Sequence, residues 1–255
     1  MIRWSVVAIS ILLLTNYSSA QESAKQEPQQ PEASSEKKNE TDETPAPKIP
    51  EALTHYMGRE IAKTMHFTGA QWLIRNRRER EERCSMMLAN LGLKRGMTVC
   101  DMGCGNGFHS LQIAEMVGEK GQVVGVDVQP EMLKLLRDRM EEKAIENVIP
   151  ILGSFHNPRL PINSIDLILL VDVYHEFSHP EQMLEAMRKS LKPDGVIVLV
   201  EFREEDPDVP IKPLHKMSKK QVNKELNANG YKLVKDFGGL PWQHMMFFGK
   251  DKSKQ

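Results

Sequence analysis

The sequence predicts an α/β protein whose mostly parallel sheet is covered by helices on both faces. Short apolar, β-branched runs end in Gly or acidic residues, as buried parallel strands do. Segments with helical spacing separate these runs, so strand and helix alternate along the chain. Such alternation is typical of a doubly wound sheet. The predicted parallel strands are residues 97–103, 122–128, 147–153, 165–173 and 195–202.

The N-terminal region is predicted to stand outside this fold. Arg3 precedes an apolar run over residues 4–14, and small residues at 18–20 suit a signal peptidase, so residues 1–20 are interpreted as a secretory signal peptide. Residues 21–50 are rich in Glu, Gln, Ser, Lys and Pro, which predicts a disordered polar linker. We therefore expect an exported protein, periplasmic or secreted, with one domain over residues 51–255. A wrongly assigned start or an uncleaved anchor is the alternative, and a wrong start would leave the protein cytoplasmic.

Charge and cysteine content exclude several classes of protein. The formal net charge is -1, so no global field attracts nucleic acid or an anionic membrane. The apolar run near the N-terminus is shorter than the roughly 20 residues that span a bilayer, so no stable membrane span is expected. There are 3 cysteines, and this odd number argues against a disulfide scaffold. A small molecule is the expected partner.

The helices between the strands have clear ends. Apolar residues at helical spacing over residues 108–117 stop at Gly118. Pro130 opens a second helix and Pro180 a third, because proline suits the first helical position. A turn with the sequence KPDG, residues 192–195, is expected between the third helix and the next strand.

The C-terminal part follows a different pattern. Ser218 and Gln221 form a capping-box start for a helix that continues to Leu226. Residues 230–237 and 242–250 are strand-like and are joined by the short segment GGLP. These features predict a β-hairpin that closes the sheet.

A glycine loop follows the first predicted strand. The stretch CDMGCGNGF contains Gly103, Gly105 and Gly107, whereas a dinucleotide fingerprint needs its third glycine at the position of Phe108. The loop still allows a backbone to pass close to a ligand. Asp127, at the end of the second predicted strand, is placed to accept hydrogen bonds from a ribose diol.

The stretch VDVYHEFSHPEQML contains an H-E-x-x-H motif in His175, Glu176 and His179. Two zinc-binding imidazoles would need one helix, but a buried strand precedes the motif and Pro180 disfavours helical geometry at His179. The motif is therefore predicted to span a strand-to-helix loop, and no metal site is predicted. A looser metal site that uses Asp172, His175 or Glu176 is the minor alternative.

Several of these motifs together resemble those of class I S-adenosylmethionine-dependent methyltransferases, in the type 11 group that includes quinone C-methyltransferase-like enzymes. The matching stretches are VCDMGCGNG, VVGVDVQPEML, SIDLILLVDVYHEF and LKPDG, and the resemblance covers residues 91–248. It implies a Rossmann-like, seven-stranded sheet with the last strand antiparallel. It also implies S-adenosylmethionine as cofactor, a core over residues 91–250, and a helical lid over residues 51–90.

The resemblance also implies roles for individual residues. The methionine end of the cofactor would lie on the glycine loop, the ribose on Asp127, and the adenine beside Val128 and Met132. Ser154 and Phe155 stand where the family often has an acidic residue near the adenine. The full expected cofactor set is Asp101, Gly103, Gly105, Asn106, Gly107, Asp127, Val128, Met132, Ser154, Phe155 and Asp172.

Catalytic and substrate residues are expected around the same sheet edge, because ligands collect at the carboxyl ends of parallel strands. His175 and Glu176 are candidate bases for an acceptor that arrives protonated, and Tyr174 is a candidate substrate contact. Residues expected to contact the substrate are His66, Trp72, Glu201, Arg203 and His215.

The sequence thus predicts an enzyme that transfers methyl groups from S-adenosylmethionine to a small molecule by in-line displacement. An exported, non-catalytic relative that binds a small ligand is the alternative, because the predicted export leaves the supply of this cofactor unexplained. A metal-dependent hydrolase that uses the loop with His175 and Glu176 is a further alternative.

Overall fold

The computed structural model describes residues 49–253. The predicted signal peptide and nearly all of the predicted linker lie outside these residues. None of the helices in the described part is both long and apolar enough to cross a membrane.

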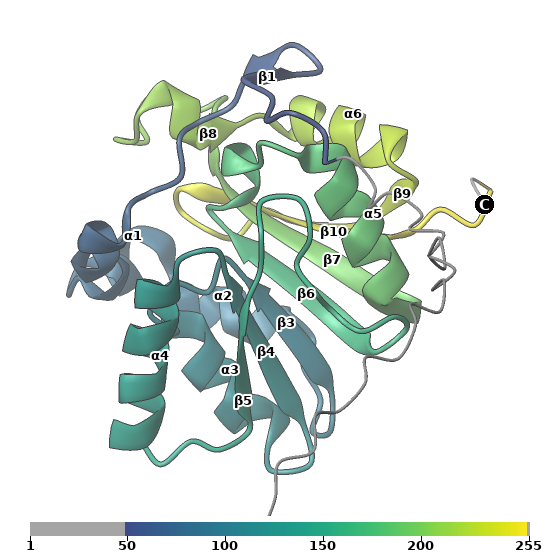
Figure 1. Cartoon of the computed structure of the whole chain (residues 1–255). Helices are drawn as coiled ribbons and strands as arrows, with labels where there is room; N and C mark the ends of the chain where they lie inside the picture. Colours follow the sequence, from purple (N-terminus) through teal and green to yellow (C-terminus); the bar gives the residue numbers. More distant parts are fainter. Residues whose placement is uncertain (1–48, 254–255) are drawn as a thin grey trace, which may run out of the picture. The chain divides into compact units, whose positions relative to one another are not determined.

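An eight-stranded sheet forms the centre of the domain (Figure 1). Its order is β5-β4-β3-β6-β7-β10-β9, and the short β8 pairs with the end of β7. Strands β3 to β7 are mutually parallel, whereas β10 is antiparallel to both β7 and β9. The predicted fold class and C-terminal hairpin are therefore confirmed, with β8 as an additional strand. The strands are β3 Thr98–Met102, β4 Gln122–Asp127, β5 Val148–Leu152, β6 Ile165–Val171, β7 Leu191–Arg203, β8 Lys216–Met217, β9 Tyr231–Phe237 and β10 Gln243–Lys250.

Two apolar layers cover the two faces of this sheet. One contains Met102 and Val126 with side chains from α5 and α6, and the other contains Val99 and Val123 with side chains from α2, α3 and α4. Alternate residues of one strand thus enter opposite layers, as the period of a strand requires. The helices are α1 Arg78–Glu82, α2 Cys84–Asn90, α3 Phe108–Val117, α4 Pro130–Glu142, α5 Pro180–Ser190 and α6 Lys219–Ala228.

The strand order reverses beside β3. After β5 at one edge, the chain crosses to β6 on the other side of β3. Connections therefore diverge at the carboxyl ends of β3 and β6, and such a divergence leaves room for a ligand in doubly wound sheets.

The predicted helix ends are largely confirmed. Helix α3 stops at Gly118, whose φ of +68° favours glycine, and α4 and α5 begin at Pro130 and Pro180. The predicted KPDG turn lies instead within the bounds of β7, because Leu191 pairs with Ile165 before the register shifts.

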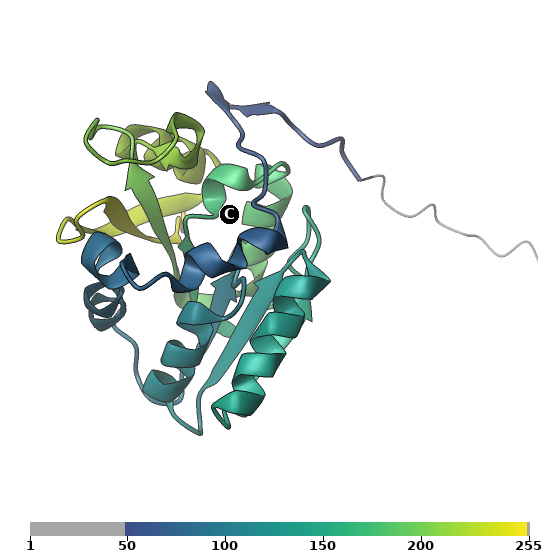
Figure 2. The ribbon, with the colours of Figure 1, turned by 90° about the vertical axis from the view of Figure 1, so that its left-hand side faces the viewer.

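The N-terminal segment crosses the carboxyl ends of the strands as short pieces. These are β1 His55–Tyr56, β2 Arg59–Glu60, the 3-10 helix η1 Phe67–Ile74, and helices α1 and α2. In Figure 2 this segment, in dark blue, runs from β1 down to η1 and then to α1 and α2. The 3-10 helices η2 Tyr174–Glu176 and η3 Pro213–His215 belong to loops at the same edge.

A buried ion pair joins the N-terminal segment to α6. The Arg59 guanidinium donates to both carboxylate oxygens of Glu225, at 2.7 and 3.2 Å, and to the carbonyl oxygen of His175 at 3.0 Å. Glu225 is fully buried and also accepts from the Tyr174 hydroxyl at 2.8 Å. One guanidinium therefore fixes β2, α6 and the loop after β6 together.

We predict that Arg59→Met lowers the free energy of unfolding by about 3–5 kcal/mol, because Glu225 loses its cation but stays buried. Urea denaturation followed by circular dichroism measures this. Lys134→Met is the matched control, since it removes an exposed ion pair with Asp138 on α4 and should cost no more than about 1 kcal/mol. Equal losses in the two variants would contradict the assigned role of Arg59.

Candidate active site

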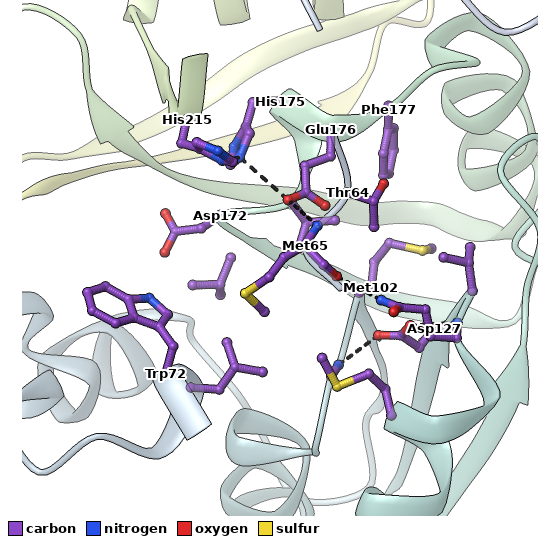
Figure 3. Close-up of a pocket in the computed structure, with 18 of the residues that line it drawn as sticks. Thr64, Met65, Trp72, Met102, Asp127, Asp172, His175, Glu176, Phe177 and His215 are labelled. Carbon is purple, nitrogen blue, oxygen red and sulfur yellow. Dashed lines mark hydrogen bonds and ion pairs between the residues drawn. The ribbon is translucent and has the colours of Figure 1, made fainter. Parts of the chain in front are cut away.

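A cavity of about 520 Å³ lies at the carboxyl ends of the central strands, beneath the N-terminal segment (Figure 3). The loops after β3, β4, β6 and β7 contribute to its wall, together with η1. Figure 3 shows Asp127 at one end of the cavity and His175, Glu176 and His215 at the other. Between them the wall is mostly apolar, with side chains such as Met65, Leu73, Met102, Val126, Val173, Phe177, Phe202 and Ile211.

The glycine loop forms part of the cavity floor. Gly103 and Gly105 line the cavity with φ of +68° and +52°. A Cβ at Gly105 would come within 2.5 Å of Leu73 Cδ1, and one at Gly103 within 2.6 Å of Val173 Cγ2. Both positions therefore need glycine, and they leave bare backbone beside the cavity. Gly107 instead packs against Leu136 at the start of α3 and does not line the cavity.

Asp127 ends β4 with its carboxylate at the cavity wall. One oxygen accepts from the Gly105 backbone N–H and the other from that of Gln129, both at 2.9 Å. Burial raises the pKa of this carboxyl above its ordinary value, although the backbone hydrogen bonds oppose the shift. Each oxygen has a further lone pair, so the group can still accept from a ligand diol. Val128, Met132, Ser154 and Phe155 also line this end.

Asp172, after β6, has a left-handed backbone conformation and one carboxylate oxygen without a hydrogen-bond partner in the described part of the chain. Its φ is +54°, in the left-handed region, and its Oδ2 accepts from Gln243 at 2.8 Å. Oδ1 is buried without a hydrogen-bond partner among the described residues, although Asp172 lines the cavity. Burial raises the pKa of this carboxyl well above its ordinary value. A buried, unpaired carboxylate oxygen favours a cationic ligand or a hydrogen-bond donor.

A polar cluster closes the far end of the cavity. His175 Nδ1 lies 2.7 Å from Glu201 Oε2, and His175 Nε2 lies 3.0 Å from His215 Nδ1. Glu176 Oε1 is 4.0 Å from His175 Nε2 and accepts from the Met65 backbone N–H at 3.2 Å. The arrangement brings together two imidazoles and a carboxylate from the separate elements η2 and η3.

The pKa shifts of His175, Glu176 and His215 differ in direction and in cause. Burial lowers the pKa of His175, but the Glu201 carboxylate more than offsets this, so the pKa is raised. Burial raises the pKa of Glu176 to about 7. For His215, burial and the neighbouring His175 lower the pKa.

The structure separates the two histidines of the H-E-x-x-H motif. His175 belongs to η2, whereas His179 precedes α5 and its Nε2 lies 3.0 Å from the Pro50 carbonyl oxygen. The motif therefore spans a strand-to-helix loop, as the sequence predicted, and the two imidazoles do not share one helix face.

Several expected substrate and catalytic residues lie away from the cavity. Tyr174 is fully buried and its hydroxyl donates to Glu225, so its side chain lies in the core and not at the cavity wall. Arg203 donates to backbone carbonyls such as that of Leu240, at 2.6 Å, and points toward the β9–β10 turn. His66 is exposed at the start of η1. Glu201 does not line the cavity but holds His175.

Two expected cofactor residues support the glycine loop from behind. Asp101 is buried and accepts from the Ser110 hydroxyl at 2.5 Å, and burial raises its pKa to about 6. Asn106 is buried and donates to the Ala70 carbonyl oxygen at 3.1 Å, which ties the loop to η1. Neither lines the cavity in this structure, and their direct contact with the cofactor stays a prediction. Trp72, in contrast, lines the cavity with its ring beneath the Arg75 guanidinium.

Gln129 also lines the cavity, although no sequence motif predicts it. Its side-chain oxygen accepts from the Phe67 N–H at 2.8 Å, and its amide donates to the Met65 carbonyl oxygen at 2.9 Å. It thereby fastens the N-terminal segment over the cavity. Its position in the sequence, between Asp127 at the end of a strand and Pro130 at the start of a helix, could have indicated a site residue. Loops at this edge of the sheet lie beside the ligand region.

The fold and the cavity together define a class. A doubly wound sheet with an antiparallel strand beside β7, a glycine loop after β3 and a carboxylate after β4 are features of an enzyme that binds a nucleoside cofactor.

Comparison with known families agrees with that class. A family model described as a methyltransferase domain matches residues 93–249, more than half of the chain, and the chain belongs to this methyltransferase family. The structure of a SAM dependent methyltransferase from Aquifex aeolicus is similar, with 26% identity, a TM-score of 0.69, and coverage of 72% of this chain and 98% of that one. A putative type 11 methyltransferase from Sulfolobus solfataricus, at 20% identity and a TM-score of 0.56, shares the fold over 69% of this chain and 96% of that chain.

Curated relatives are similar over part of the chain. The ubiquinone/menaquinone biosynthesis C-methyltransferase of Azotobacter vinelandii is 27% identical over 172 residues, which are 61% of this chain and 67% of that protein. The protein of the same name from Shewanella sp. (strain W3-18-1) is 29% identical over 130 residues, 51% of this chain and 49% of that protein. The chain thus spans about half the length of the Shewanella relative. It is an S-adenosylmethionine-dependent methyltransferase, as the resemblance implied.

We predict that Gln129→Ala speeds amide hydrogen exchange at Phe67 by about fivefold, because the backbone N–H loses its acceptor and one hydrogen bond contributes about 1 kcal/mol. Exchange followed by NMR or mass spectrometry measures this. Gln112→Ala is the matched control, since the Gln112 amide caps a carbonyl on α3 away from the cavity. Unchanged exchange at Phe67 would show that Gln129 does not fasten the segment.

Proposed function

We propose that the chain methylates a small, largely apolar acceptor that binds in the same cavity as S-adenosylmethionine. The observation that carries this proposal is the continuity of one cavity from Asp127 and the glycine loop to the cluster of His175, Glu176 and His215. A cofactor and an acceptor must lie end to end for in-line displacement, and a single cavity with two distinct polar ends suits both.

Four features of the cavity fit S-adenosylmethionine. Gly103 and Gly105 leave bare backbone for close approach. Asp127 has lone pairs available for the two ribose hydroxyls. Asp172 Oδ1 is a buried carboxylate oxygen without a partner among residues 49–253, which suits the positive charge of this cofactor. Val128, Met132, Ser154 and Phe155 would surround the adenine.

S-adenosylmethionine supplies a methyl group on a positively charged sulfur, which leaves as a neutral thioether with the electron pair of the broken carbon–sulfur bond. The protein's own part is to orient the acceptor and exclude water. The Met65 and Trp72 side chains cover the cavity from the N-terminal segment. The acceptor's nucleophilic atom gains the methyl group, and any proton it carries leaves toward the polar cluster.

The acceptor class follows from the wall of the cavity. Apolar side chains between the two ends favour an aromatic or otherwise apolar body, and the polar cluster favours a hydroxyl group on it. The similar proteins of Azotobacter vinelandii and Shewanella are named for ubiquinone/menaquinone biosynthesis. We therefore propose a hydroxylated aromatic compound as acceptor, and formation of S-adenosylhomocysteine with a panel of such phenols tests this.

We predict that Asp127→Asn weakens S-adenosylmethionine binding about ten- to hundredfold, because hydrogen bonds to a charged acceptor contribute about 1.5–3 kcal/mol. Isothermal titration calorimetry of the full chain measures the dissociation constant. Asp138→Asn, an exposed carboxylate on α4, is the control. Equal affinity for all three proteins would overturn the ribose assignment, and absence of binding to the wild type would favour a relative with another ligand.

We predict that Glu176→Gln lowers kcat at least about tenfold while the S-adenosylmethionine dissociation constant changes less than about threefold. The reason is that Glu176 lies at the end of the cavity opposite Asp127, and the amide can still accept from the Met65 N–H. Parallel turnover and calorimetry measurements test this. Equal loss of binding and turnover would instead indicate a structural role for Glu176.

A further inference from the structure

We propose that His175, Glu176 and His215 bind a divalent transition-metal ion at the acceptor end of the cavity. The role of the ion rests on the proposed function, whereas the binding itself depends only on these side chains. The three residues are contributed by η2 and η3, which are separated in sequence but in contact in space.

The spacing of the donor atoms suits a single ion. One atom from each of the three residues lies within 4.8 Å of the others. The shortest separation, between His175 Nε2 and His215 Nδ1, is 3.0 Å, and Glu176 Oε1 lies 4.0 Å from His175 Nε2. Ligands at about 2.0–2.2 Å from one metal ion are themselves about 3–4 Å apart, so small side-chain adjustments complete the site. Among residues 49–253, these three residues form the one group of His, Cys, Asp or Glu side chains whose donor atoms are spaced in this way.

Glu201 prepares His175 for this role. Its carboxylate is buried and lies 2.7 Å from His175 Nδ1, so that nitrogen carries the proton and donates it. The tautomer leaves the Nε2 lone pair directed toward His215. A carboxylate behind a ligating imidazole is the usual orienting partner in metal sites, because it fixes the ring and increases its basicity.

The remaining partners of the cluster are compatible with a cation. Glu176 lies on the Nε2 side of His175 and can ligate the ion, whereas Glu201 lies on the Nδ1 side and adds a negative charge behind the ring. The Arg59 guanidinium is directed away from the ring nitrogens, since it donates to the His175 carbonyl oxygen and to Glu225. The alternative to a metal site is an ordinary hydrogen bond between the two imidazoles, with no ion between them.

Two imidazoles and one carboxylate leave coordination positions open. Sites with three protein ligands and an open position are typical of catalytic metal ions, whereas structural sites are closed by four. His175, Glu176 and His215 all line the cavity, so an open position would face the acceptor. An ion there would bind the acceptor's hydroxyl oxygen and favour its anionic form. This identifies the acceptor end as a site for a phenolic or enolic oxygen.

Zinc titration of the full chain, stripped with a chelator, tests the proposal by calorimetry. Zinc is the probe because nitrogen and oxygen sites bind it more tightly than manganese or iron. We expect one ion per chain for the wild type and for the control His55→Ala, which removes an exposed imidazole on β1. We expect at least about tenfold weaker binding for His215→Ala and for Glu176→Gln, and about ten- to hundredfold weaker binding for Glu201→Gln.

Two outcomes would overturn the metal site. One is the absence of zinc binding by a wild-type chain that still binds S-adenosylmethionine, and this result leaves the proposed function intact. The other is equal zinc affinity for the wild type, His215→Ala and Glu176→Gln, which places the ion elsewhere. Circular dichroism melting of each variant identifies any that fails to fold, and His215→Asn then replaces His215→Ala because it keeps a polar group at η3.

Discussion

The buried carboxylate of Glu201 determines the shape of the end of the cavity that contains His175. It accepts from the Tyr174 backbone N–H at 2.8 Å and from His175 Nδ1 at 2.7 Å, so one side chain of β7 fixes the loop that follows β6. This is possible because parallel neighbours end at the same edge of a sheet. A charge buried in this way is costly unless it is paired, and removal of its partners would leave it unsatisfied. The position of His175 is therefore prepared before any ligand binds.

Most of the fold could be predicted from the sequence because local and global signals agree. Apolar runs, the prolines that open α4 and α5, and Gly118 after α3 each specify one element, and the resulting order permits few topologies. The segment from η1 to α2 was not predictable in detail. Its short helices depend on contacts distant in sequence, such as Asn106 with Ala70 and Gln129 with Phe67, rather than on an apolar period of its own.

Some of the expected site residues line the cavity and others do not, because neighbouring side chains point in different directions. In the 3-10 turn at residues 174–176, successive side chains diverge by about a third of a turn. Tyr174 is therefore in the core while His175 and Glu176 line the cavity. Asp101 and Asn106 belong to the recognised loop motif, but Asp101 accepts from the Ser110 hydroxyl on α3 and Asn106 donates to the Ala70 carbonyl oxygen in η1. A motif specifies which segment approaches a ligand, whereas packing decides which of its side chains touch it.

The H-E-x-x-H motif illustrates the same limit for metal sites. Its spacing presents two imidazoles to one ion only within a continuous helix, and here the second histidine is bonded to the Pro50 carbonyl oxygen. The partner of His175 is His215, which reaches it because the loop after β7 ends at the same sheet edge as the loop after β6. The order of the strands, and not the spacing within one motif, therefore determines which imidazoles meet in this protein. The cationic cofactor, beside Asp127 and the glycine loop, and the acceptor, beside the His175–His215 pair, would occupy ends of the cavity with different chemistry, which fixes the direction of the transfer.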